Sequence, residues 1–152
     1  MLRTSLIFAL LFAFALLSNL NASEQGTRFL RNPDVGPEQI AFVHANDIWL
    51  VSREGGNAFR LTSGQGEENH PAFSPDGQWI AFTGQYGGNS DVYVVSVKGG
   101  EPKRLTWHPG ADIVQGWTPD GQIMFQSGRA GQPTRLWQFY QVSPDGGFPH
   151  PI

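Results

Sequence analysis

The chain repeats a short phrase, and this repeat limits its possible folds more than any other feature. FSPDG occupies residues 73–77, and WTPDG occupies residues 117–121, 44 residues later. RLT recurs at the same interval, and the glycine pair of EGG recurs twice, in KGG and in DGG. Landmarks that keep one order and a period in the forties, with strand-like segments between them, are typical of propeller blades, each a four-stranded sheet.

The middle unit predicts all four strands of such a blade. Pro75-Asp76-Gly77 predicts a turn, because proline presets φ, aspartate bonds its own backbone and glycine accepts a left-handed conformation. A first strand is expected at 70–74, and the other three at 79–83, 91–97 and 103–107. The segments WIAF and VYVV are apolar on both faces, which indicates a sheet between two neighbouring sheets. We therefore predict an all-β fold, a partial β-propeller of about three four-stranded antiparallel blades.

Aromatic residues recur with the repeat, and recurrence predicts a place in the core between blades. One set follows the second strands and consists of Phe42, Phe82 and Phe125. A second set lies at steps of 44 residues and consists of Trp49, Tyr93 and Trp137. We expect Trp107 and Trp117 to be similar in kind.

The landmarks also divide the chain into segments. We expect a signal peptide at 1–22, a leader at 23–31, and blades at 32–69, 70–111 and 112–152. Aligned on the double glycine, Ile152 falls on Leu105, so the third blade is expected to stop inside its last strand. Three blades do not close a propeller, which typically has four to eight. Either copies of the chain complete the ring or the sequence is the front of a longer chain, and we favour the longer chain.

The first 22 residues differ from the rest. Arg3 is followed by an unbroken apolar run at 6–17, and small residues flank a cleavage point near Ala22. This order is typical of a secretory signal, which predicts a periplasmic or extracellular protein. The alternative is a membrane anchor, although twelve apolar residues are too few to span a bilayer. The chain has no cysteine, so its stability must come from packing and not from disulfides.

No catalytic constellation is visible in the sequence. The four histidines, His44, His70, His108 and His150, lack the spacing of metal ligands. We expect His70 and His108, which lie next to Pro71 and Pro109, to be turn and rim residues. Ser74 and Thr118 hold the same place before the two Pro-Asp-Gly turns, which favours a turn-capping hydroxyl over a nucleophile. Asp76 and Asp120 likewise read as turn formers and not as a carboxylate pair. We predict no catalytic, cofactor-binding or metal-binding residue and no cofactor.

Two further observations bear on partners. The net charge of −3 gives no reason to expect a nucleic-acid partner. The loop Gln85-Tyr86-Gly87-Gly88-Asn89-Ser90 mixes an aromatic group with polar groups, so it is a candidate for touching a ligand; the alternative is an ordinary solvated hairpin.

A longer stretch carries a family resemblance. NDIWLVSREGGNAFRLTSGQGEENHPAFSPDGQWIAFTG, followed by GGNSDVYVVSVKGGEPKRLTWHPGADIVQGWTPDG, resembles the amino-terminal propeller of tricorn-type proteases, from about Leu30 to Ile152. The resemblance implies a bacterial, exported parent with a six-bladed propeller, a second propeller, a PDZ-like module and a serine-protease core. The propellers of that family are expected to gate or guide peptides, and the family's catalytic residues lie in the core, so none is carried over onto this chain.

The resemblance also defines the expected partners and the alternatives. The partners would be peptide or protein substrates, the remaining blades and the protease core, with a homo-oligomer as a further option. SPDG alone is shared with TolB-like proteins, so a non-enzymatic propeller that serves as a protein-binding scaffold is the alternative. A prolyl-oligopeptidase relative is a weaker third option.

Overall fold

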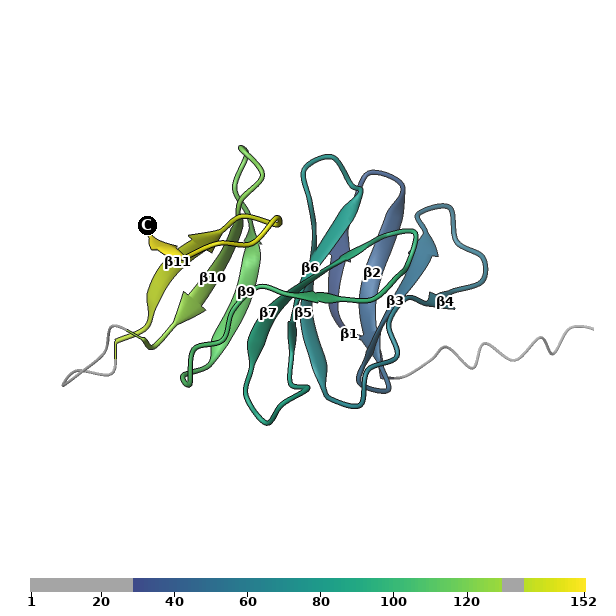
Figure 1. Ribbon diagram of the computed structural model, residues 1–152. Coiled ribbons are helices and arrows are strands. Elements are labelled where there is room, and N and C mark those ends of the chain that lie inside the picture. Colours follow the sequence, from purple (N-terminus) through teal and green to yellow (C-terminus); the bar gives the residue numbers. More distant parts are fainter. Residues whose placement is uncertain (1–28, 130–135) are drawn as a thin grey trace, which may run out of the picture.

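The computed structural model describes residues 29–129 and 136–152, which form three four-stranded antiparallel sheets that stand side by side (Figure 1). This arrangement confirms the predicted all-β, partial-propeller fold. The predicted signal peptide and most of the predicted leader lie outside the described residues. Within the described ranges, no helix has the length and the apolar character needed to cross a membrane.

Each sheet pairs its strands in the order of the chain. The first sheet contains β1 (Arg31–Val35), β2 (Gln39–His44), β3 (Asp47–Ser52) and β4 (Phe59–Arg60). The second contains β5 (Glu68–Phe73), β6 (Trp79–Gly84), β7 (Asp91–Ser96) and β8 (Lys103–Arg104). The third contains β9 (Asp112–Trp117), β10 (Ile123–Ser127), β11 (Gln138–Val142) and β12 (His150–Pro151).

The repeated phrase forms the same turn in the second and third sheets. In the second sheet, the Gly77 amide donates to the Ser74 carbonyl at 2.8 Å, and the Ser74 amide donates to the Trp79 carbonyl at 2.9 Å. In the third sheet, the Gly121 amide donates to the Thr118 carbonyl at 3.0 Å, and the Thr118 amide donates to the Gln122 carbonyl at 2.8 Å, so the second bond spans four residues in place of five. Gly77 and Gly121 have φ of 68° and 83°, a left-handed conformation that strains other residues. The turn therefore needs its glycine, as the sequence predicts.

The sheets pack face to face through two apolar clusters. The cluster between the first and second sheets consists of Ala41, Ile48, Leu50, Ile80, Phe82, Tyr93 and Val95. The cluster between the second and third sheets consists of Ala81, Val92, Val94, Leu105, Val114, Ile123, Phe125, Tyr140 and Val142. Alternate residues of β6 and β7 enter different clusters, because successive side chains of a strand point to opposite faces. This explains why both strands are apolar throughout.

The predicted aromatic core is correct in part. Phe82 and Phe125 are buried between sheets, as predicted. Phe42 is also buried but belongs to neither cluster between sheets; it lies with the half-buried Trp49 on the other face of the first sheet, so the predicted position between blades is wrong for these two.

Trp137, however, is 54% exposed, and Tyr140 takes the expected place, since Tyr140 pairs with Phe125 as Tyr93 pairs with Phe82. The interval from Tyr93 is thus 47 residues and not 44, because the segment between the second and third strands is longer in the third sheet.

The two other tryptophans of the prediction differ from each other. Trp107 is 65% exposed, so its predicted core position is wrong. Trp117 is partly buried and packs against the cluster between the second and third sheets. Position in the repeat therefore predicts burial within the strands but not in the loops that follow them.

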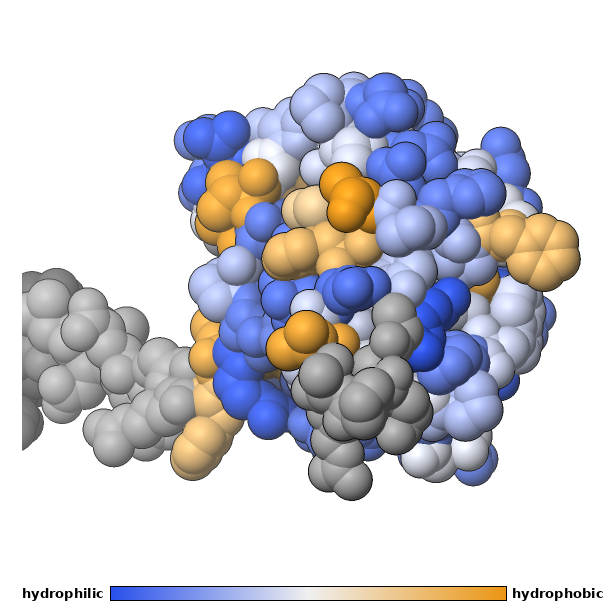
Figure 2. Space-filling model, turned by 90° about the vertical axis from the view of Figure 1, so that its left-hand side faces the viewer, coloured by the Kyte–Doolittle hydropathy of each residue, from blue (hydrophilic) through white to orange (hydrophobic). Residues whose placement is uncertain are grey.

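The outer face of the third sheet has no sheet packed against it among the described residues. Figure 2 looks onto this side and shows separate apolar clusters set among hydrophilic surface. Phe139 and Ile152 belong to this sheet region and are 43% and 68% exposed. They occupy the places that Val92 and Leu105 hold in the second sheet, where both are buried. This face therefore carries the pattern of one that receives another sheet.

Candidate functional site

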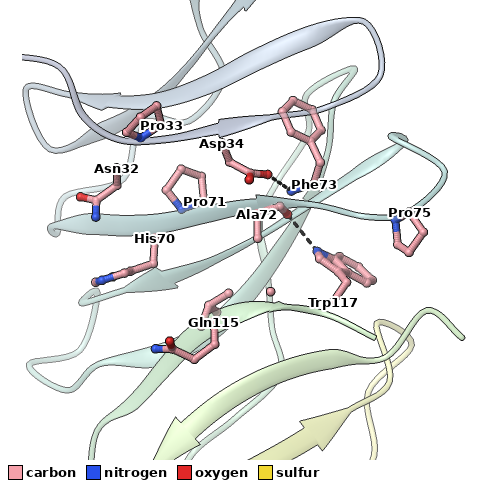
Figure 3. Close-up of a pocket in the computed structure, with 12 residues that line it drawn as sticks. Asn32, Pro33, Asp34, His70, Pro71, Ala72, Phe73, Pro75, Gln115 and Trp117 are labelled. Carbon is pink, nitrogen blue, oxygen red and sulfur yellow. Dashed lines mark hydrogen bonds between the residues drawn. The ribbon is translucent and has the colours of Figure 1, made fainter. Parts of the chain in front are cut away.

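The three sheets converge on their first strands. Every substantial contact between sheets involves β5 or β9, and β5 lies between β1 and β9. These three strands line a pocket of about 380 Å³ (Figure 3). A volume of this size falls in the range of ligand pockets, roughly 300–1,000 Å³. The pocket is the candidate functional site, because all three sheets contribute side chains to it.

Each of the first strands carries a bulge at the pocket. The pairing of β1 with β2 shifts between Arg31 and Asp34, and the pairing of β5 with β6 shifts between Asn69 and Ala72. The pairing of β9 with β10 skips Gln115. Bulges redirect side chains and are frequent next to functional sites. The same device therefore recurs three times around one pocket.

Two of these bulges place a non-glycine residue in the left-handed region. Asn32 has φ of 47° and His70 has φ of 52°, and each directly precedes a proline. A positive φ is uncommon for non-glycine residues, and a following proline restricts the backbone further. Such strain is typically kept only where the surroundings enforce it, and it gathers at ligand sites.

Asn32, His70 and Gln115 form what we call the polar column. The three side chains come from β1, β5 and β9, and their polar ends lie toward the same side of the pocket (Figure 3). All three residues are exposed. Among the described residues, the side chains of Asn32 and His70 make no hydrogen bond, and Gln115 makes only a long one, 3.5 Å, to the Ile113 carbonyl. The column is therefore free to bind.

The wall of the pocket is held by polar groups that are already paired. The Asp34 carboxylate accepts a hydrogen bond from the Phe73 amide at 2.7 Å, which ties the first sheet to the second. The Trp117 indole donates to the Ala72 carbonyl at 2.9 Å, which ties the third sheet to the second (Figure 3). These bonds fix the spacing of the three strands, so the polar column is supported from both sides.

A buried carboxylate at the start of β5 joins the first and second sheets. Glu68 is fully buried and accepts hydrogen bonds from the Tyr86 hydroxyl, the Thr62 hydroxyl and the Ile48 amide. Burial, together with the Glu68 carboxylate, holds the pKa of Tyr86 far above its usual range. Tyr86 also packs edge-on against Tyr93, with ring centroids 4.7 Å apart. A buried carboxylate with three donors is a structural anchor.

The third sheet fills the same positions with different chemistry. Asp112 is 44 residues after Glu68, and Arg129 is 43 residues after Tyr86. The Arg129 guanidinium donates to the Asp112 carboxylate at 2.6 Å and lies over the Tyr140 ring, 4.9 Å from its centroid. One Asp112 oxygen, Oδ1, has no partner among the described residues. The aspartate is one methylene shorter than Glu68. Among the described residues, it accepts no hydrogen bond from the neighbouring sheet, whereas Glu68 accepts one from the Ile48 amide.

A third polar contact repeats at the edge of the first two sheets. Asp47 pairs with Arg60 at 2.9 Å, and Asp91 pairs with Arg104 at 2.6 Å, an interval of 44 residues. Burial raises the pKa of Asp91, although the Arg104 charge opposes this rise. In the third sheet the equivalent positions are Gln138 and Pro151, so this pair is absent there. These pairs brace strands within one sheet and do not face the pocket.

The structure separates the four histidines. His70 alone lines the pocket at the first strands. His44 lies beside Trp49 on the first sheet, with ring centroids 5.6 Å apart, and His108 accepts the Gly110 amide through Nδ1 at 2.9 Å. His150 is exposed in β12. No group of metal-ligating residues forms within the part of the chain that the structure describes.

The predicted turn residues act as turn residues. The Ser74 hydroxyl donates to the Asp76 carboxylate at 2.5 Å and accepts from the Trp79 amide at 2.9 Å. The bond from Ser74 lowers the pKa of Asp76. The Thr118 hydroxyl accepts from the Gln122 amide at 2.9 Å.

The loop at 85–90 is turned toward the protein. Tyr86 reaches Glu68, and the Asn89 amide donates to the His108 carbonyl at 2.7 Å. The two side chains of this loop that were candidates for contacting a ligand, Tyr86 and Asn89, therefore form hydrogen bonds within the protein. The polar column was missed instead, and the available signal was the X-Pro dipeptide in the first strand of both units, Asn32-Pro33 and His70-Pro71.

Comparison with known proteins agrees with this architecture. Residues 27–152 match the family model described as the tricorn protease N-terminal beta propeller domain. Tricorn protease homolog 1 of Streptomyces coelicolor is 40% identical over 55 residues, which cover 36% of this chain and 5% of that protein. A tricorn protease homolog of Saccharolobus solfataricus is 37% identical over 51 residues, 34% of this chain and 5% of that protein.

Solved structures give the same result over more of the chain. The crystal structure of the tricorn protease matches with a TM-score of 0.70 and 30% identity, over 81% of this chain and 13% of that one. TolB from Acinetobacter baumannii matches with a TM-score of 0.63 and 26% identity, over 82% of this chain and 32% of that one. The chain thus spans a small part of these relatives. Since the family match covers most of its residues, the chain belongs to the tricorn protease N-terminal beta-propeller family.

Proposed function

We propose that this chain is the amino-terminal propeller region of an exported tricorn-type serine protease. It is non-catalytic itself and guides peptides toward a protease core, and its complete propeller has six blades. The observation that carries the proposal is the pocket at the first strands, where three similar bulges place the polar side chains of Asn32, His70 and Gln115 around one pocket. A surface that guides many different peptides needs polar contacts that do not select particular peptide side chains, and the side chains of this pocket fit that requirement.

The proposal includes partners and a location. The remaining blades and the protease core would cover the outer faces of the first and third sheets. On the third sheet, Phe139 and Ile152 are exposed. The protein would act outside the cytoplasm, because residues 1–22 have the order of zones typical of a secretory signal. Neither nucleic acid nor a cofactor is part of this function.

The proposal is tested in the protein's own cells. An epitope tag in the turn at Gly55-Gly56, which is exposed, allows precipitation from separated cytoplasmic and exported fractions. A fluorophosphonate probe then labels active serine hydrolases, and fluorogenic peptides report cleavage. We expect a precipitate from the exported fraction that is labelled and cleaves peptides, with both signals lost after treatment with a serine-hydrolase inhibitor. Precipitated protein that carries neither signal would refute the protease proposal and favour the TolB-like scaffold.

A further inference from the structure

We propose that the polar column of Asn32, His70 and Gln115 binds the backbone amides of an extended peptide. This inference deepens the proposed function and rests on it. It assigns the contact to three named side chains on β1, β5 and β9. The three line one pocket, and their polar ends share one side of it (Figure 3).

The chemistry of the column matches a peptide backbone. The amides of Asn32 and Gln115 each offer donors and an acceptor, and a neutral imidazole at His70 offers one of each. A peptide backbone presents the same two kinds of group along its length. Asp34 is the one acidic or basic side chain that lines the pocket, apart from the histidine, and it already accepts the Phe73 amide. The pocket therefore contains no lysine or arginine that would select a carboxylate or phosphate.

The strain at two of the three positions supports a binding role. Asn32 and His70 hold left-handed φ values that glycine would adopt with less strain, and the bulge of β9 does contain a glycine, Gly116, with φ of 151°. Asn32 and His70 instead keep a polar side chain at a cost in backbone energy. Because neither side chain forms a hydrogen bond with the described part of the fold, structural pairing does not account for them.

This strain makes a clean experiment possible. His70→Gly and Asn32→Gly remove the polar groups and relieve the backbone at the same time, so we expect thermal midpoints equal to or above that of the wild type. Gln115→Ala removes the third group. Gln65→Ala is the matched control, because Gln65 is equally exposed but does not line the pocket. All variants are made in the full chain.

The probe is an uncharged, blocked hexapeptide, N-acetyl-(Gly-Ser)₃-amide. Its binding is followed by nuclear magnetic resonance at the indole N–H of Trp117, which lies in the pocket wall, with Trp117→Phe used to assign the signal. We expect each column variant to weaken binding roughly fivefold, as for the loss of one neutral hydrogen bond. The control should bind like the wild type. A peptide with N-methylglycine at the three glycines, which lacks those N–H groups, should bind about tenfold more weakly.

The outcomes separate the two proposals. If the wild type binds the peptide and the column variants bind it equally well, the column is not the contact, while the proposed function stands. If the methylated peptide binds as well as the parent, backbone recognition is refuted. If the wild type binds no peptide at all, the proposed function fails and this inference fails with it. Binding of maltotetraose in place of the peptide would assign the column to saccharides and overturn the inference.

Discussion

The two Pro-Asp-Gly turns allow two costs of replacing a glycine to be measured separately: the cost of backbone strain and the cost of a clash with the neighbouring sheet. Gly77 and Gly121 occupy the same place after Pro-Asp, with φ of 68° and 83°, and the amide of each donates to the carbonyl three residues before it. A Cβ at Gly121 would meet no heavy atom within 4 Å. A Cβ at Gly77 would lie 2.7 Å from Cδ and 2.8 Å from Cγ of Pro37 in the first sheet. Alanine therefore adds strain alone at one turn, and strain plus a clash at the other.

The expected magnitudes follow from this difference. Gly121→Ala should cost about 1–2 kcal/mol, the penalty for a non-glycine residue in the left-handed region. Gly77→Ala should cost about 1–3 kcal/mol more, as for overpacking against a stiff neighbour. Urea unfolding of the full chain, followed by tryptophan fluorescence, measures both. In thermal unfolding, roughly 4 °C corresponds to 1 kcal/mol for a domain of this size.

A second substitution checks the cause. Pro37→Ala removes the ring atoms that the new Cβ would meet. In the Gly77→Ala background it should therefore recover the free energy of unfolding that the clash removes, and only the loss from backbone strain should remain. The double-mutant cycle should give a coupling of the size of that recovered free energy. Equal losses for Gly77→Ala and Gly121→Ala, or a coupling near zero, would refute the packing of the first sheet against this turn.

Three other substitutions and titrations test the packing around Glu68 and Tyr140. Tyr86→Phe keeps the ring but removes a donor to the buried Glu68, so it should cost about 1–3 kcal/mol in urea unfolding. Because the folded pKa of Tyr86 is raised, its contribution to stability is present below pH 10 and is lost at higher pH. Burial also raises the pKa of Tyr93, so absorbance at 295 nm should show both tyrosines titrating later than a free tyrosine while the fold persists, and Tyr86→Phe should flatten the alkaline fall in stability. Tyr140→Ala should cost about 3–5 kcal/mol, whereas Trp137→Ala should change stability by about 0.5 kcal/mol or less; the reverse order would contradict the register of β11.

The turns and strands were predictable because their causes are local. Pro75, Asp76 and Gly77 each favour the turn through their own backbone, so the sequence alone predicts it. Trp137 was misplaced because a fixed period of 44 assumes equal loops, and the loop before β11 is longer. The correct landmark was the pair of Tyr140 with Phe125, which depends on strand register and not on spacing.

The candidate site was harder to predict because its causes are not local. The left-handed φ of His70 arises where β5 loses register with β6, between Asn69, which pairs with Thr83, and Ala72, which pairs with Ala81. These partners lie nine to fourteen residues further along the chain. From sequence, His70 reads as a rim residue beside a proline, and nothing in one unit shows that Asn32 and Gln115 will share its pocket. The loop at 85–90 looked better suited to a ligand because its composition is polar, but its groups are used by Glu68 and by the His108 carbonyl.

The contrast between Glu68 and Asp112 shows which equivalent residues of the second and third sheets could replace each other. Within a sheet, the backbone determines the turn, so Ser74 and Thr118 can replace each other. The loop after the second strand of each sheet, by contrast, supplies a hydrogen-bond donor that must fit the acid at the start of the first strand. Tyr86 is neutral and donates to a glutamate that also reaches the first sheet, whereas Arg129 is charged and meets a shorter aspartate. Tyr86 packs against Tyr93, and Arg129 packs over Tyr140. Each of the two donors is bonded to a different acid, Glu68 for Tyr86 and Asp112 for Arg129. The second and third sheets therefore share one fold, but the contacts that their buried acids make differ, so the two sheets are not interchangeable.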